Sequence, residues 1–237
     1  MTSVVDHPLV GTLSTYVGAP EAAEDLRRYF LTGTTPGSGT GRWFDQLGGG
    51  GDAPATRDAI TADDILALLA LGVVVPVQMS WLLLHEETAH VTYLLEQIPA
   101  DVDIWEVADE TLAAGSPLER LWRLLQRTAS PVDSEARRRA IAGKLLARKR
   151  PRLVPAHATE VQDLVHLGSG ASCWRSLRSA LADDRLLDQL SARARDAGLP
   201  ARISLLRVLD VIVWMQATRV AATPDSSLAP LETQSVA

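Results

Sequence analysis

The chain of 237 residues has a single cysteine, two phenylalanines and three tyrosines, and no series of segments alternates apolar and polar residues as strands do. One cysteine, Cys173, excludes a disulfide framework and any zinc or iron–sulfur site built from several cysteines. The sequence also lacks internal repeats and the Gly-x-Ser-x-Gly elbow of many serine hydrolases. Its first residues have neither the basic start nor the apolar stretch of a secretory signal, so we expect a cytoplasmic protein.

What the sequence does contain is enough apolar material for a packed core: 46% of the residues are hydrophobic and 22% are charged. The length fits one large domain. We therefore expect an all-α protein with a single helical domain over residues 1–222. A glycine-rich loop is expected at 33–60. The polar residues 223–237, which contain proline and serine, are expected to form a disordered tail.

Helix boundaries are indicated by capping patterns. Thr61 precedes Asp64 by three residues, Ser116 is followed by proline and then Glu119, and Ser134 precedes a long helical stretch. Pro99, Pro151 and Pro200 break the pattern, because proline has no N–H for an interior helical turn. The expected helices are 21–31, 62–71, 76–97, 101–113, one from 116, 134–148, 157–166, 171–183, 185–197 and 201–221.

From Ile65 to Leu84 the sequence has twenty residues without a formal charge, the length of a membrane-spanning helix. Gly72 and Pro76 interrupt it, and no lysine or arginine flanks either end to set an orientation. We therefore expect two core helices joined around Val73–Pro76, and no membrane partner. An alternative is that these uncharged helices form the face of a homodimer in a protein with a structural role.

The segment His85-Glu-Glu-Thr-Ala-His90 resembles the HExxH motif of zinc proteases but has one residue too many. Five residues turn a regular helix by about 500°, so the two imidazoles cannot face one metal ion. We expect these residues to form the polar side of a core helix, and we expect neither a metal nor a cofactor.

Eight of the sixteen glycines lie between Gly33 and Gly51. Glycine-rich turns can bind phosphate through backbone N–H groups, and a tight turn here would place Asp52, or Asp45, in a site. One hypothesis is therefore a small enzyme whose pocket lies between this loop, Asp52 and the region of His157. In such an enzyme Cys173 could act as a nucleophile, although a buried helical cysteine is the commoner case.

The basic segment from Ser134 to Arg152 holds eight lysines and arginines and one acid, in a chain whose net charge is −6. Such a local positive field favours a phosphate-bearing partner such as DNA. The alternative is that these cations pair with acids elsewhere, such as Glu119, Asp183, Asp184 or Asp188. The residues that we expect to bind phosphate or nucleic acid are Lys144, Arg148, Lys149, Arg150 and Arg152.

Three segments, Lys144–Pro155, Thr61–Ala67 and Ile203–Asp210, resemble an uncharacterised bacterial family of unknown function over roughly residues 40 to 215. The first segment is also distantly similar to helix-hairpin-helix DNA glycosylases, which are all-α. That resemblance implies a helix through Lys144, an apolar stretch ending at Pro155, and then a catalytic aspartate. Here Ala156 and His157 follow, so the resemblance implies a degenerate relative that binds nucleic acid without established catalysis.

Overall fold

The computed structural model describes residues 8–31, 41–129, 133–156 and 170–222. Within these ranges every regular element is a helix, which confirms the expected all-α class. The α-helices are α1 (Pro8–Gly18), α2 (Ala22–Phe30), α3 (Gly41–Gln46), α4 (Ala62–Ala67), α5 (Val77–Trp81), α6 (Thr88–Leu95), α7 (Pro117–Thr128), α8 (Glu135–Lys149), α10 (Ala171–Leu181), α11 (Asp184–Asp196) and α12 (Leu205–Ala222). Short 3₁₀ or π turns add η1 (Leu47–Gly49), η2 (Leu68–Leu71), η3 (Leu82–Glu86) and η4 (Asp109–Leu112).

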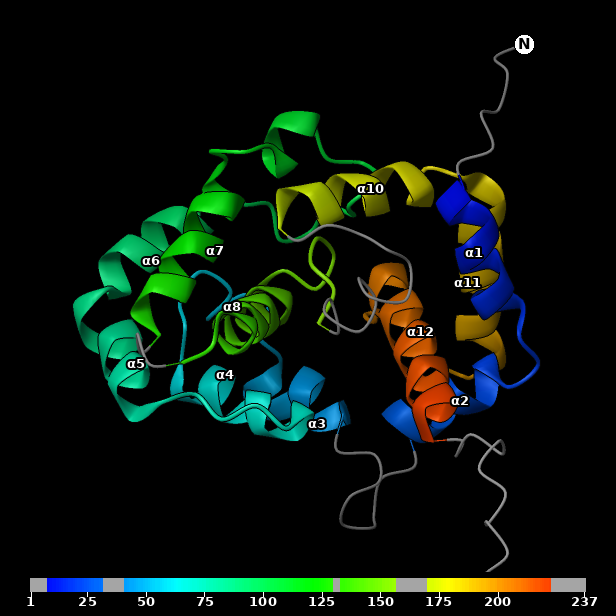
Figure 1. Ribbon diagram of the computed structural model, residues 1–237, viewed down its shortest axis with the longest axis horizontal. Helices are drawn as coiled ribbons and strands as arrows, with labels where there is room; N and C mark the ends of the chain where they lie inside the picture. The colour runs from blue at the N-terminus through cyan, green and yellow to red at the C-terminus, as the bar shows by residue number, and fades with distance from the viewer. Residues whose placement is uncertain (1–7, 32–40, 130–132, 157–169, 223–237) are drawn as a thin grey trace, which may run out of the picture.

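The helices form two groups that lie side by side (Figure 1). In one group, α4, α5, α6 and α7 surround α8; in the other, the N-terminal α1 and α2 pack against α11 and α12. The chain crosses from the second group to the first through α3, which contacts α2. The helices nearest the two ends of the described chain therefore pack against each other, and the middle of the chain forms its own cluster around α8.

Three predicted helix starts are confirmed by their hydrogen bonds. The Thr61 hydroxyl accepts from the backbone N–H of Asp64, whose carboxylate accepts from the N–H of Thr61, which is a complete capping box. The hydroxyl of Ser116 accepts from the N–H of Glu119, and that of Ser134 from the N–H of Arg137. Each side chain satisfies a donor that the first helical turn leaves without a partner.

Other boundaries differ from the expected ones. Helix α1 lies in a stretch with weak periodicity, and the glycine-rich segment contains α3 and η1, because Phe44 is buried and anchors a short helix there. The helix expected at 76–97 is divided into α5, η3 and α6. Within 101–113 only η4 is helical. The helix expected at 157–166 and the tail expected at 223–237 lie outside the described residues.

One apolar core joins both groups, with leucine as its commonest residue. The uncharged run Ile65–Leu84 does form two helical stretches joined around residues 73–76, as expected. However, it contributes to the core from one side only, since several of its large apolar side chains are exposed. In the described ranges, no helix combines the length and the apolar character that crossing a bilayer requires.

Candidate functional site

The glycine turn at residues 48–51 brings the segment after α3 onto the end of α8. Gly48, Gly49 and Gly50 have φ angles of 62°, 84° and 103°, a run of left-handed conformations that side chains with a Cβ rarely adopt. Next to them, Gly51 lies so close to the backbone carbonyl of Arg148 that a Cβ would overlap it. These glycines are therefore required for the close approach of two backbones.

The basic residues at the end of α8 point into the protein. Arg148 and Lys149 each donate to the carboxylate of Asp64 over 3.0 Å, and all three side chains are buried. The guanidinium of Arg148 also donates to the carbonyls of Phe44 and Leu47, which fixes the α3 turn. Burial lowers the pKa of Lys149, and attraction by Asp64 offsets part of that effect.

Arg150 has no exposed surface and donates to four backbone carbonyls and one carboxylate. The carboxylate belongs to Asp58, 2.6 Å away, and two of the carbonyls are those of Leu95 and Ile98 at the end of α6. Burial lowers the pKa of Arg150, and the hydrogen bond that it donates to Asp58 opposes this. Arg150 thus connects α8 to two loops that are distant in sequence.

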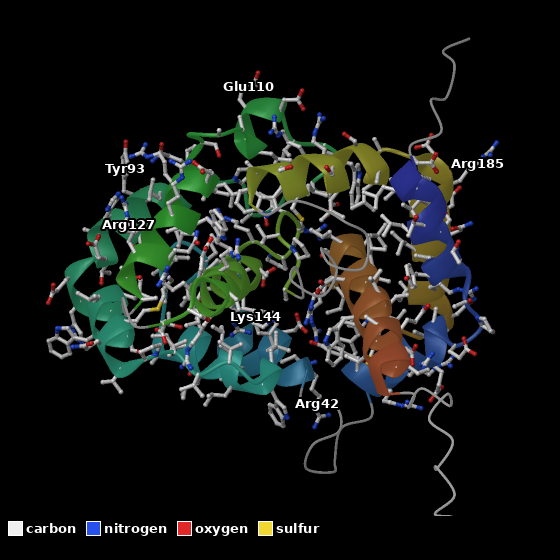
Figure 2. All side chains as sticks on the ribbon, in the orientation of Figure 1. Arg42, Tyr93, Glu110, Arg127, Lys144 and Arg185 are labelled. Atoms are coloured by element: carbon white, nitrogen blue, oxygen red, sulfur yellow. The ribbon has the colours of Figure 1, made fainter. Side chains whose placement is uncertain are left out.

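Lys144 and Arg152 complete the set that the sequence assigns to phosphate binding. The ammonium group of Lys144 is buried and donates to the carbonyl of Ala156 over 3.0 Å; Figure 2 shows this side chain in the interior beside α8. Arg152 is half-buried and pairs with Asp103 at 2.8 Å.

The expectation that these five cations form a surface for phosphate therefore does not fit their placement. Four of them are buried, and each cation donates to an acceptor of the protein itself. Their carboxylate partners are Asp58, Asp64 and Asp103, not the acids considered from the sequence. Lysine and arginine are seldom buried unless paired, and nothing in a linear sequence shows which acids the fold will bring to them.

A second buried charge cluster lies between the two helix groups. Arg207, on the first turn of α12, pairs with Asp45 at 3.1 Å, and also with Asp210 and the hydroxyl of Tyr29. Its guanidinium carbon lies 5.1 Å from the ring centres of both Tyr29 and Phe44. Burial alone lowers the pKa of Arg207, but Asp45 and its other partners outweigh burial and raise it. Burial also raises the pKa of Tyr29.

A pocket of about 330 Å³ opens above this cluster, and we call it the α3–α12 pocket. Asp45 and Arg207 line it together with Ser204 and the glycine turn. Asp52 and Arg202 also line it; both are exposed, and in the part of the chain that the structure describes neither has an ion-pair partner. The pocket therefore offers one carboxylate and one guanidinium to a ligand, beside charges that are already neutralised.

The sequence-based hypothesis of a pocket at the glycine-rich loop, Asp52 and the region of His157 stays a prediction. The structure brings the glycine turn and Asp52 to one pocket, and Asp45 lines it too. His157 lies outside the described residues, but the N–H of the preceding Ala156 donates to Asp210 over 3.2 Å. Cys173 is buried in α10 and is not among the described residues that line this pocket.

Sequence reasoning assigned no role to Arg207, Asp210, Tyr29 or Arg202. A signal was present for the first two, because Arg207 and Asp210 are three residues apart in a helix whose first half is otherwise apolar, which places them on one face. Tyr29 could not be found in this way, since only the packing of α2 on α12 brings it to Arg207.

The two histidines of the HExxH-like segment have different interaction partners. His85 stacks on Trp81 with ring centres 4.1 Å apart, and His90 interacts with Glu87 at 3.2 Å. Among the described residues no group of three or more His, Cys, Asp and Glu side chains is arranged to hold a metal ion. His85 belongs to the π turn η3 and His90 to α6, so the two histidines do not lie on one regular helix.

Comparison with known families gives one match. The model of a family of unknown function, DUF6308, matches residues 22–217, which include the pocket and the described helices from α2 to most of α12. The chain belongs to DUF6308. No curated protein and no solved structure matches the chain. The DUF6308 match agrees with the expected uncharacterised family and carries no activity with it.

Proposed function

We propose that the α3–α12 pocket binds a small molecule that carries a phosphate or carboxylate group. The single observation that carries the proposal is Arg202, an exposed guanidinium on the pocket wall without an ion-pair partner among the described residues. Arginine suits such a ligand because its planar fork donates two parallel hydrogen bonds to phosphate or carboxylate. The N-terminus of α12 opens at the same wall and adds a partial positive charge.

Asp52 and the buried charge cluster also favour a polar ligand. Asp52, carried by the glycine turn, can accept from hydroxyl or ammonium groups of the bound molecule. Arg207, which also lines the pocket, pairs with Asp45 and Asp210 and donates to the hydroxyl of Tyr29. These interactions fix the position of its guanidinium before a ligand binds. Arg207 and Asp45 of this network also line the pocket, so fixed charges lie next to any molecule that binds there.

The proposal is tested by calorimetric titration with inorganic phosphate, a nucleoside monophosphate and a dicarboxylate. Arg202→Gln should weaken binding about 10- to 100-fold, the value of one charge-assisted hydrogen-bonded contact, and Asp52→Asn should weaken it less. Arg185→Gln is the matched control, because Arg185 is an exposed arginine that projects from α11, away from the pocket (Figure 2). Absence of binding at millimolar concentrations, or equal binding by the Arg202 variant, would overturn the proposal.

The hypothesis of a small enzyme concerns the same pocket, because the glycine turn and Asp52 line it.

The proposed kinship with helix-hairpin-helix glycosylases is supported by the sequence order alone: helix α8, then the buried Leu153, Val154 and Pro155. We propose binding, and not base excision, because His157 stands where those enzymes have an aspartate.

A second candidate function keeps nucleic acid as the partner but moves the contact to α7. Arg120, Arg123 and Arg127 are spaced by three and four residues, so they share one exposed helix face. Arg123 and Arg127 line an open groove of about 780 Å³ together with Arg138 of α8. Figure 2 shows Arg127 at the outer side of the molecule.

The test of this second candidate is DNA binding measured over a range of salt concentrations. A contact through these arginines predicts a linear loss of affinity with the logarithm of salt, and Arg120→Gln with Arg127→Gln should lower the slope by about two. Arg185→Gln again serves as the control. Salt-independent binding, or an unchanged slope in the double variant, would contradict a contact through α7.

A further inference from the structure

The exposed apolar side chains of the protein are concentrated on one edge. In the described ranges, eight large apolar residues are exposed, and five of these lie between residues 66 and 81. We call these five the apolar edge: Leu66, Leu69, Val74, Val77 and Trp81. In Figure 1 the elements that carry them, α4, η2 and α5, follow the same lower side of the molecule.

The spacing of these residues gives each helical stretch an outward apolar face. Leu66 and Leu69 are three residues apart, and Val77 and Trp81 are four apart, so each pair lies on one side of its helix. Val77 is 86% exposed and Trp81 is 57% exposed. The ring of His85 stacks on Trp81 and extends the face without adding a fixed charge.

These side chains are not needed for the protein's own core. The inward face of the same segment already provides Ala67, Leu68, Met79 and Leu83, all of which are buried. The outward face is apolar as well, and the whole run Ile65–Leu84 carries no formal charge. A face that only met water would gain nothing from two half-exposed leucines, two valines and a tryptophan.

The area and the charge of this edge point to its occupant. With large side chains about half exposed, the five residues present on the order of 500 Å², within the range of functional patches. When two such faces meet, they bury about 1,000 Å², the lower limit for a specific interface. Burying a charged group against this edge would cost free energy, so the contacting surface of the partner must also be uncharged. A second copy of the chain presents the same uncharged edge and therefore fits.

We infer that the apolar edge is the contact surface of a homodimer in which Val77 and Trp81 become buried. This inference is independent of the α3–α12 pocket, which lies between the two helix groups, so it stands or falls separately from the proposed function. Truncating a buried aromatic residue commonly has the largest effect on such an interface.

The experiment is sedimentation-equilibrium centrifugation of the full chain over a range of protein concentrations. The wild-type mass should rise from one copy to two, whereas Val77→Glu and Trp81→Glu should remain monomeric, with dissociation constants raised at least about 30-fold, as for loss of a hot-spot contact. Tyr93→Glu is the matched control, because it places the same charge on another exposed aromatic residue, on α6. It should dimerise like the wild type.

Hydrogen exchange of the wild type at low and high concentration gives a second measurement that needs no substitution. Amides between residues 66 and 81 should become more protected as concentration rises, and those around Arg185 should not change. A wild type that is monomeric at all concentrations, a dimer that tolerates both glutamates, or protection elsewhere would overturn the inference.

Discussion

The carboxylate of Asp64 accepts the Nε–H of Arg148 over 3.0 Å although the two residues are 84 positions apart in the chain. The same carboxylate accepts from Lys149 and from the backbone N–H and hydroxyl of Thr61. One buried acid therefore caps α4 and anchors the end of α8. The basic segment, which in the sequence resembles a surface for phosphate, is thus a structural element that holds the α8 group together.

Asp64→Ala should be strongly destabilising, because it leaves Arg148 and Lys149 buried without their shared carboxylate. We expect a loss of about 3–5 kcal/mol in the free energy of unfolding, measured by urea denaturation. Asp63→Ala is the control: Asp63 is exposed in the same helical turn, and its loss should cost less than about 1 kcal/mol. Similar losses for the two variants would show that the buried pairing contributes little.

Replacing Arg148, Lys149 and Arg150 together by glutamate should prevent folding, because it places three negative charges beside Asp58 and Asp64 in the interior. Circular dichroism should show loss of helical signal. The corresponding change of Arg120, Arg127 and Arg185, which are exposed and have no ion-pair partner among the described residues, should leave the helical signal intact. If the first variant remained folded, the buried placement of these cations would be wrong.

The stability of the protein should fall at alkaline pH through Tyr29. Burial raises the pKa of Tyr29 above its ordinary value near 10, so above about pH 10 the unfolded chain loses this proton while the folded chain keeps it. The folded state then binds more protons, and its stability decreases by up to about 1.4 kcal/mol per pH unit.

This prediction is checked by urea unfolding between about pH 8 and 11. Tyr29→Phe should lose less stability over the alkaline part of this range than the wild type, even though it lacks the hydrogen bond to Arg207 and starts lower. Tyr93→Phe, which removes an exposed hydroxyl on α6, should keep the wild-type slope. Parallel curves for the wild type and Tyr29→Phe would contradict the assignment.

Two glycine substitutions should have opposite effects. Gly51→Ala should destabilise the protein by about 1–3 kcal/mol, since its Cβ would overlap the backbone carbonyl of Arg148, which cannot move aside. Gly143→Ala should stabilise it by about 0.5–1 kcal/mol, because this glycine lies inside α8 with open space around its Cβ position. Thermal melting of both variants beside the wild type measures the two shifts. Equal shifts in melting temperature for the two variants would show that the position of Gly51 has room for a Cβ beside the carbonyl of Arg148.

The sequence by itself determined the all-α class, several helix starts and the break in the uncharged run. These depend on local chemistry: the hydroxyls of Thr61, Ser116 and Ser134 satisfy donors within three residues, and Pro76 lacks the N–H that a continuous helix would need there. It also indicated a tight turn at the glycine run, because consecutive residues with positive φ angles favour glycine wherever they occur.

Only the tertiary structure decided which charges meet. Arg148 pairs with Asp64, Arg150 with Asp58, and Arg207 with Asp45, and each pair joins segments that are many residues apart. A linear sequence shows that a stretch is basic, but whether its charges face water or a carboxylate depends on helix packing, which follows from the apolar surface of the whole chain. The same packing decided that Val77 and Trp81, apolar and expected in the core, lie on the outside.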